Sequence, residues 1–258
     1  MISPSTDPVG ADIVESLAEI GYDYIELSMS GIAALPEPEF ASLAGRLRRS
    51  GIQCEALNCF FPARVRLTGE FASLEQALEY AAGAMDRAAA LGAEIIVLGS
   101  SGAKNVPEGF SMDAAWRQIV ELLRHLGPMA AERSLTIAIE PLNRGESNIV
   151  TLGSEGLRLA REANHPNIQL LIDYYHLAIE KEDPGIVVEA GRALRHVHFA
   201  KVEGRSFPDR IEEDYRRFFA CLRQNGYSKR CSIEANTTDF VADARRALAV
   251  MKQLDTEQ

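Results

Sequence analysis

The sequence lacks the features that would place it in several common protein classes. It has no run of about 18 apolar residues, which a membrane-spanning helix requires. Its N-terminus, MISPSTDPVGAD, has no basic segment followed by an apolar one, so no secretory signal is expected. The four cysteines form no CxxC pair, and their spacing fits neither a zinc ribbon nor a small disulfide scaffold. We therefore expect reduced, mostly buried thiols in a cytoplasmic protein with no membrane partner.

Positive charge is also scarce. The chain has 27 lysines and arginines against 37 acidic residues, a formal net charge of −10. Because nucleic-acid binding draws much of its affinity from phosphate neutralisation, this balance argues against a nucleic-acid partner. The phosphate-binding patterns GxGxxG and GxxxxGK[ST] do not occur either, which removes the main support for nucleotide binding.

What the 258 residues do contain is a regular alternation of short apolar runs and longer helical patterns. Seven runs are typical of buried strands: 23–28, 52–58, 94–98, 136–140, 168–173, 195–199 and 230–234. Eight stretches have helical character: 10–20, 37–50, 72–91, 111–133, 154–163, 185–191, 211–225 and 239–254. Three serines are predicted to cap helix starts: Ser73, Ser111 and Ser154.

Strands that alternate with helices predict βαβ units and a parallel sheet. A doubly wound sheet would normally have a glycine-rich turn after its first strand, so we predict an α/β fold of the (β/α)8 TIM barrel type, one domain spanning residues 1–258. An eighth strand must then precede the first helix, where only MISPST is available. We expect Ile2 to Ser5 to form a short first strand beside 23–28; the alternative is a truncated strand and a natural start upstream of Met1.

Four successive predicted strands finish with a group that can bind a metal ion. These groups are Glu140, Asp173, His198 and Glu234. In a barrel such strand ends meet at the C-terminal face, where active sites of this fold are built. Three carboxylates and one imidazole favour a hard or borderline divalent cation, so we predict a single ion, Mn²⁺ first, with Mg²⁺ and Co²⁺ as alternatives. Such an ion acts as a Lewis acid on a hydroxy-ketone.

Other polar residues accompany these strand ends. Loop residues that follow them converge on the same rim, as recognition of a polyol requires: Glu146, His176, Lys201 and Arg205. His196 lies two residues before His198 on the same strand face, and we expect it to pack or to support that ligand. For Glu26 and Glu55, which lie within strands, we expect surface or rim positions.

The segments IEPLNRGE, IDYYH, HVHFAKVEGR and SIEAN resemble the sugar isomerase/epimerase superfamily with a xylose-isomerase-like barrel. The likeness extends from about residue 10 to 252 and is strongest to ketose 3-epimerases (tagatose and psicose epimerases), with hydroxypyruvate isomerase as a neighbour. It implies four metal ligands: Glu140, Asp173, His198 and Glu234. It also implies acid/base roles for Glu140 and Glu234 on opposite faces of the substrate. Contacts to substrate hydroxyls and the carbonyl would come from Glu146, His176 and Arg205.

The sequence departs from the ketose 3-epimerases in its loops. Arg205 lies one residue farther from His198 than the family arginine does. NCFFPARVRLTGE and GSSGAKNVPEGF do not resemble the corresponding psicose-epimerase loops, which leaves the identity of the sugar open. Basic residues in the seventh loop could bind phosphate, but no glycine-rich turn follows the last strand, so we favour an unphosphorylated sugar.

The resemblance implies proton abstraction beside a carbonyl, with the metal stabilising an enediolate. Return of the proton on the opposite face gives an epimer, and return to the neighbouring carbon gives an aldose–ketose isomerase. Two alternatives stay open: a dehydratase of the same superfamily, such as inosose or dehydroshikimate dehydratase, and a non-catalytic sugar-binding protein. The apurinic endonuclease branch fits poorly with five histidines and a net charge of −10. The partner is then a small sugar, and the oligomeric state stays open, a homo-oligomer included.

Overall fold

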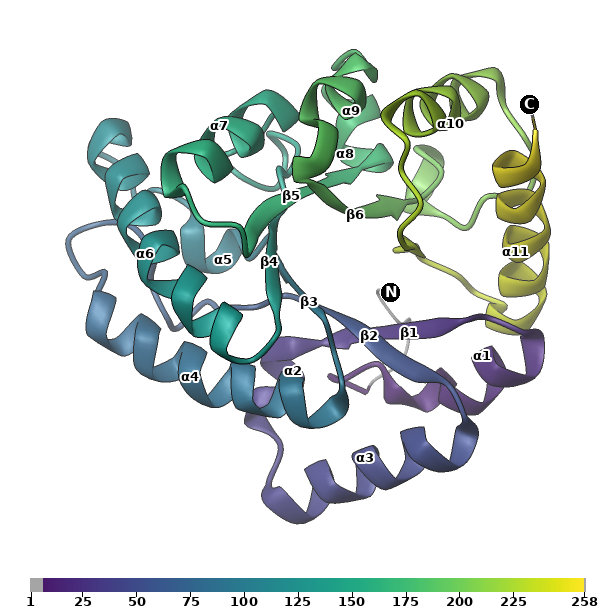
Figure 1. Ribbon diagram of the computed structural model, residues 1–258, viewed down its shortest axis with the longest axis horizontal. Coiled ribbons are helices and arrows are strands. Elements are labelled where there is room, and N and C mark those ends of the chain that lie inside the picture. Colours follow the sequence, from purple (N-terminus) through teal and green to yellow (C-terminus); the bar gives the residue numbers. More distant parts are fainter. Residues whose placement is uncertain (1–6, 258) are drawn as a thin grey trace.

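A single parallel sheet organises the chain (Figure 1). The computed structural model describes residues 7–257, and its seven strands follow one another in chain order. They are β1 (Tyr24–Ser28), β2 (Gln53–Asn58), β3 (Ile95–Leu98), β4 (Thr136–Ile139), β5 (Ile168–Asp173), β6 (Leu194–Phe199) and β7 (Cys231–Ile233). Each lies within a residue of its predicted ends. The sheet curls into a nearly closed barrel with helices outside it, which confirms the predicted TIM-barrel fold.

The predicted long helices cover the outside of the barrel. They are α1 (Val14–Ile20), α3 (Glu37–Ser50), α4 (Leu74–Leu91), α6 (Met112–Glu132), α7 (Gly153–Ala163), α9 (Gly185–Ala190), α10 (Glu213–Asn225) and α11 (Phe240–Thr256). Three short helices were not predicted: α2 (Met29–Ala34), α5 (Ser101–Lys104) and α8 (Tyr174–Ile179). The short 3-10 segments are η1 (Ala11–Ile13), η2 (Gly191–Ala193) and η3 (Glu203–Arg205). The missed helices α2 and α8 follow β1 and β5 directly, and α5 begins shortly after β3, so the sequence shows no separate helical segment at these places.

Two of the three predicted serine caps are present. Ser73 accepts a hydrogen bond from the backbone of Gln76, and Ser111 accepts one from Ala114. The prediction for Ser154 is wrong, because α7 begins one residue earlier. Glu182, from a distant loop, accepts the first amides of that helix instead, at 2.7 Å from Gly153 N and 3.1 Å from Ser154 N.

Alternate side chains on the strands divide between the barrel interior and the helical layer. On β3, Ile95 and Val97 belong to a small inner group with Ala138 of β4, whereas Ile96 and Leu98 pack into the large core beneath the helices. A strand buried on both faces therefore has an apolar residue at every position, as the sequence of β3 shows. Polar side chains in the interior are exceptions to this pattern, and they lie towards β1, β6 and β7.

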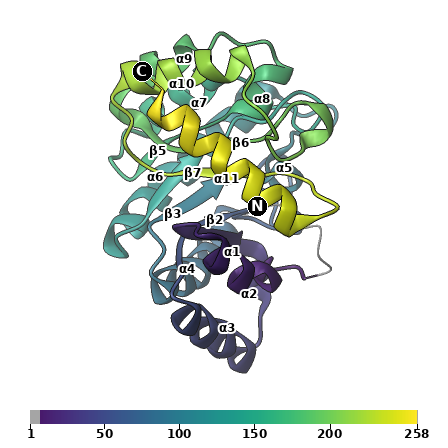
Figure 2. The same cartoon turned by 90° about the vertical axis from the view of Figure 1, so that its right-hand side faces the viewer.

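The described sheet is open between β1 and β7, and side chains link these two edges. Tyr24 Oη lies 2.6 Å from Ser232 Oγ. Arg230 donates two hydrogen bonds to Glu55 of β2, at 2.6 and 2.5 Å, and its guanidinium lies over the ring of Tyr24. Figure 2 shows α11 running across this side of the molecule. The predicted first strand, Ile2 to Ser5, lies outside the described residues.

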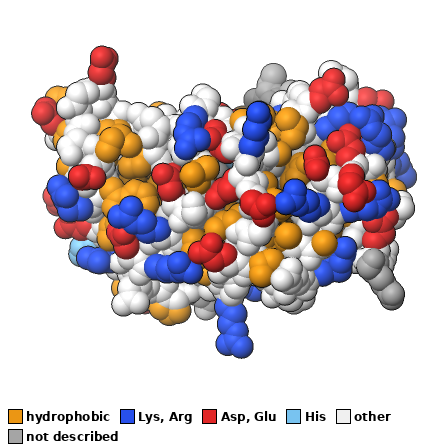
Figure 3. Space-filling model, turned by 90° about the horizontal axis from the view of Figure 1, so that it is seen from above, with side chains coloured by type: hydrophobic (Ala, Val, Ile, Leu, Met, Phe, Trp, Pro, Cys, Tyr) orange, Lys and Arg blue, Asp and Glu red, His pale blue; other side chains and the backbone are white. Residues whose placement is uncertain are grey.

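Charges on the surface are mixed in sign. Over the face in Figure 3, acidic and basic side chains are interspersed with apolar ones. Elsewhere among the described residues, charged side chains also pair, for example Arg158 with Glu162 at 2.7 Å and Arg217 with Asp183 at 2.8 Å. Of the helices within residues 7–257, none has the length and hydrophobicity needed to cross a bilayer.

The four cysteines carry free thiols, but the expectation that most are buried is wrong. Only Cys54 is buried; Cys59 is exposed, and Cys221 and Cys231 are half-buried. Cys59 follows the end of β2 directly.

Candidate metal centre and active site

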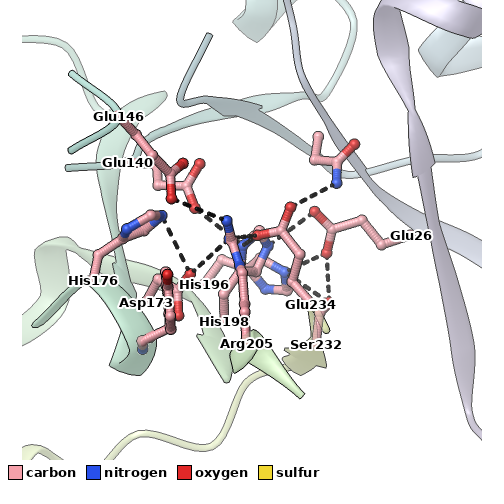
Figure 4. Close-up of polar contacts among 12 residues, drawn as sticks. Glu26, Glu140, Glu146, Asp173, His176, His196, His198, Arg205, Ser232 and Glu234 are labelled. Carbon is pink, nitrogen blue, oxygen red and sulfur yellow. Dashed lines mark hydrogen bonds and ion pairs between the residues drawn. The ribbon is translucent and has the colours of Figure 1, made fainter. Parts of the chain in front are cut away.

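The four predicted ligands meet at the C-terminal mouth of the barrel (Figure 4). All are buried, and each offers a ligand atom within 4.8 Å of the other three: Glu140, Asp173, His198 and Glu234. They come from the ends of β4, β5, β6 and β7, so parallel strand order alone brings them together. The predicted convergence of these side chains is therefore found.

The His198 ring bridges two sets of carboxylates. Its Nδ1 lies 3.2 Å from Glu140 Oε1 and 3.0 Å from Glu234 Oε2. Its Nε2, on the opposite side of the ring, lies 2.9 Å from Glu26 Oε1 in the barrel interior. An imidazole nitrogen that faces two carboxylates is well placed to share a cation with them.

The two carboxylate oxygens of Asp173 have different partners, one in a helix cap and one in the site. Oδ1 accepts a hydrogen bond of 2.8 Å from Tyr175 N and so caps the start of α8. Oδ2 lies 3.3 Å from Arg205 Nη2 and 3.6 Å from His176 Nε2. The helix cap fixes the side chain and leaves one oxygen for a ligand.

Small and polar neighbours position the two glutamates. A Cβ atom at Gly99, just after β3, would overlap Glu140 Oε2, so the carboxylate occupies the space that glycine leaves. Buried Lys104 of α5 donates to the backbone oxygen of Glu140 at 3.1 Å, and burial lowers the pKa of Lys104 to about 8. Asn58, at the end of β2, donates to Glu234 Oε1 at 3.3 Å.

Burial and mutual repulsion set the ionisation of this centre. Burial raises the pKa of Asp173 to about 7; Glu234 and Glu140 raise it too, while His198 and Arg205 oppose them. Burial also raises the pKa of Glu140. Burial acts in the same direction on Glu234, but the charges of His198 and Arg205 overcome it and hold its pKa well below the usual range. Such a cluster of buried carboxylates is the environment in which a bound cation is favourable.

A second group of polar residues faces the centre from the loops. His176 Nδ1 accepts a hydrogen bond of 3.2 Å from Asn143 N, so its proton is on Nε2. Burial, aided by the charge of Arg205, lowers the pKa of His176 to about 3, which keeps the ring neutral. Among the described residues, His176 Nε2 and Arg205 Nε are buried donors without a partner. Glu146 lies at the rim, 3.5 Å from Arg205 Nη1.

Arg205 reaches the centre through a left-handed turn. Gly204 and Arg205 have φ angles of 69° and 46°, and the amide of Asn236 donates to the Arg205 carbonyl at 2.6 Å. The guanidinium lies 2.8 Å from Glu234 Oε2 and over the ring of Tyr175 at 4.7 Å. A non-glycine residue at positive φ is strained, and such strain is common at functional sites.

The prediction for Glu26 is wrong. It is 4% exposed and lies inside the barrel, where it contacts His196 and His198. Its neighbours Ile25 and Leu27 pack beneath the helices, so strand alternation places Glu26 on the inner face. Glu55, by contrast, is half-buried and pairs with Arg230. Sequence reasoning also missed three neighbours of the site: Asn58, Lys104 and Asn143.

Comparison with known proteins places the chain in a family. The sequence profile of the xylose isomerase-like TIM barrel family matches residues 14–254. The chain belongs to this family. Within the xylose isomerase-like barrels, it is 33% identical over 123 residues to the L-ribulose 3-epimerase of Methylomonas sp. (strain DH-1), covering 47% of this chain and 43% of that protein. It is 23% identical over 222 residues to the D-psicose 3-epimerase of Agrobacterium fabrum, covering 83% and 75%.

Solved structures of xylose isomerase-like barrels agree with the fold. A D-allulose 3-epimerase from Methylomonas sp., in complex with D-allulose, superposes with a TM-score of 0.82 at 26% identity, covering 95% of this chain and 91% of that one. A D-psicose 3-epimerase in the presence of D-fructose gives a TM-score of 0.86 at 19% identity, covering 96% and 94%. The chain spans less than half of the length of the Methylomonas ribulose epimerase that it matches in sequence.

Proposed function

We propose that this protein is a ketose 3-epimerase that depends on one divalent metal ion and acts on an unphosphorylated sugar, in a single barrel domain. The observation that carries the proposal is the meeting of Glu140, Asp173, His198 and Glu234 in one buried group. These residues would hold the cation, with Mn²⁺ expected first and Mg²⁺ or Co²⁺ as alternatives. When bound, the ion supplies Lewis-acid polarisation of the substrate carbonyl. The epimerase names of the relatives support the reaction class.

The proton transfers belong to two glutamates of the chain. One of Glu140 and Glu234 removes the proton from the carbon next to the carbonyl, and the other returns a proton on the opposite face. The reaction is reversible, so each residue serves as acid in one direction and as base in the other. Both carboxylates lie within hydrogen-bond distance of His198 Nδ1, which places them around one small volume.

The loop residues bind the substrate oxygens in this proposal. His176 Nε2 carries a proton and Arg205 Nε is a further donor, and neither has a hydrogen-bond partner among the described residues. A sugar hydroxyl or carbonyl oxygen would satisfy both groups. The positive charge of Arg205 also stabilises the negative charge that develops on the enediolate oxygens. Glu146 at the rim accepts from a further hydroxyl.

The basic residues near the mouth support an unphosphorylated substrate. Lys201 lies 3.4 Å from Asp209 and 3.7 Å from Glu203. Arg210 lies 3.0 Å from Glu212. Because acidic partners already neutralise both cations, a phosphate would have to displace them. A cytoplasmic location is part of the same proposal, and the oligomeric state stays open, a homo-oligomer included.

Turnover of a ketose panel tests this function. The panel contains D-fructose, D-psicose, D-tagatose and L-ribulose, each incubated with the Mn²⁺-loaded protein and with the EDTA-treated protein. We expect the C3 epimer of at least one sugar with Mn²⁺ and none after EDTA, followed by recovery when Mn²⁺ is restored. The Glu140→Gln variant should lose a factor of about 10² to 10⁴ in turnover, because the amide keeps the shape and removes the acid/base group.

Three results would contradict the proposal. A dehydrated product would indicate a lyase of the same family. Binding of a sugar without turnover would indicate a sugar-binding protein. Full turnover in EDTA would remove the role of the metal.

A further inference from the structure

A second polar cluster lies inside the barrel, beneath the proposed metal centre. We call it the inner cluster and define it as Tyr24, Glu26, His196 and Ser232. It is buried except for the half-buried Tyr24, in an interior otherwise lined by apolar side chains. Polar groups in such a place cost free energy unless they are hydrogen-bonded, so their presence calls for a physical reason.

The hydrogen bonds of the inner cluster all lead to Glu26. Glu26 Oε2 lies 2.5 Å from Ser232 Oγ and 3.0 Å from His196 Nε2. Tyr24 Oη lies 2.6 Å from Ser232 Oγ, so the tyrosine donates to the serine and the serine to the carboxylate. The other oxygen, Glu26 Oε1, lies 2.9 Å from His198 Nε2. Figure 4 shows the side chain of Glu26 pointing from its strand towards the two histidines.

Irregularities in the sheet bring these groups together. The pairing of β1 with β2 shifts register between Ile25 and Glu26. The pairing of β5 with β6 shifts between Leu170 and Leu171, and Leu171 is the partner of His196. Such shifts commonly re-aim side chains next to functional sites. Both Glu26 and His196 therefore occupy positions where the sheet departs from regular geometry.

We propose that Glu26 is a positioning residue that orients His198 for metal binding. A neutral imidazole has one donor and one acceptor nitrogen, and the partner of one nitrogen decides the role of the other. Glu26 accepts the Nε2 proton of His198, so a cation held with Glu140 and Glu234 would meet the lone pair of Nδ1 once the proton on Nδ1 has left. A carboxylate behind a ligand histidine also increases the basicity of that ligand. The inference rests on the proposed metal centre.

The same distances argue against the other use of these groups, a second cation held by Glu26, His196 and His198. The three residues are close enough to bind one. However, each oxygen of Glu26 already lies within hydrogen-bond distance of a donor nitrogen or hydroxyl. His196 Nδ1 has no partner among the described residues, so the proton of this neutral ring belongs on Nε2, facing Glu26. A donor hydrogen in that position excludes a cation from the same space.

Manganese affinity of three variants tests the inference. Glu26→Gln removes the negative charge behind His198, Ser232→Ala removes one donor that holds Glu26, and Glu55→Gln changes a glutamate of the neighbouring strand that pairs with Arg230 instead. The dissociation constant and stoichiometry are measured by calorimetry and by the paramagnetic resonance signal of free Mn²⁺. The melting temperature of each metal-free variant is measured in parallel.

We expect one Mn²⁺ per chain and an affinity about 10- to 100-fold weaker in Glu26→Gln. Ser232→Ala should weaken binding by a smaller factor, and Glu55→Gln should bind as the unaltered protein does, even if its melting temperature falls. The inference is overturned if Glu26→Gln melts earlier but binds Mn²⁺ normally, or if the protein binds two ions per chain. Should Glu26→Gln fail to fold, normal binding by Ser232→Ala overturns it as well. Absence of Mn²⁺ binding by the unaltered protein contradicts the proposed metal centre itself, which distinguishes the two failures.

Discussion

Carboxylate side chains in this barrel have different roles because their surroundings differ. Glu26 and Glu55 lie on neighbouring strands, yet one contacts two histidines in the interior and the other pairs with an arginine on the outside. Asp173 serves two purposes at once, because one oxygen caps a helix and the other faces the centre. The role of a carboxylate here follows from the strand face and the partners that the fold supplies.

The ionisation of Asp173 predicts how metal binding depends on pH. Burial and the neighbouring glutamates raise its pKa to about 7 in the metal-free protein, so the carboxyl is mostly protonated below that pH. A cation binds the ionised form, and the proton must leave first. We therefore expect the ionisation of Asp173 to make the Mn²⁺ affinity fall by about tenfold per pH unit below pH 7. Against the effect of burial, Glu26 and Glu234 raise the pKa of His198 well above its ordinary value, so its proton must leave too, and the affinity should continue to rise above pH 7.

Calorimetry in two buffers with different ionisation enthalpies measures this proton release. At about pH 6 the apparent binding enthalpy should depend on the buffer, and at about pH 8 this dependence should shrink. An affinity that stays constant across this range would show that no group of the centre releases a proton.

At the scale of elements, the predicted strands and long helices were found because their apolar periods extend over several residues. The short helices α2, α5 and α8 escaped prediction because none completes two turns and each begins within three residues of a strand end, whereas the equally short α9 lies well after the preceding strand. They matter for the site nevertheless: α8 is capped by Asp173, and α5 supplies Lys104. The left-handed turn at Arg205 also gave no sequence signal beyond the glycine before it.

Gly99, which lies just after β3, allows a direct test of whether the site needs the observed position of Glu140. In Gly99→Ala the new methyl group would overlap the carboxylate of Glu140. Because that carboxylate is the end of a flexible side chain, it can move away, so we expect little loss of stability. Turnover and Mn²⁺ affinity should both fall by at least about tenfold, since a metal site tolerates only small displacements of its groups.

Gly83→Ala is the matched control for this experiment. Gly83 lies within α4, and a Cβ atom there would meet nothing within 4 Å. The substitution should leave turnover unchanged and stabilise the protein by about 0.5–1 kcal/mol. Normal turnover in Gly99→Ala would show that Glu140 does not need its observed position.

At the scale of the whole molecule, the sequence supported the barrel and the meeting of four strand ends. Four strand ends meet at one face of a barrel when the strands are parallel and follow one another in the sheet. The alternation of strands and helices in the sequence predicts both properties. The contacts inside the barrel could not be predicted in this way. Tyr24 and Ser232 are 208 residues apart, and their hydrogen bond depends on the curvature that brings β1 near β7. The position of Glu26 inside the barrel depends on which of the two faces of β1 is turned towards the interior.

The central claim is that this barrel moves a proton on the carbon next to a carbonyl. Incubation of the Mn²⁺-loaded protein in D₂O with each ketose of the panel tests it most directly, with deuterium followed by NMR. The account predicts deuterium at C3 in the epimer and loss of epimer formation in both Glu140→Gln and Glu234→Gln, because the glutamate that remains can exchange only the C3 proton on its own face. An epimer that forms without solvent deuterium, or epimer formation at the full rate in either variant, would contradict it.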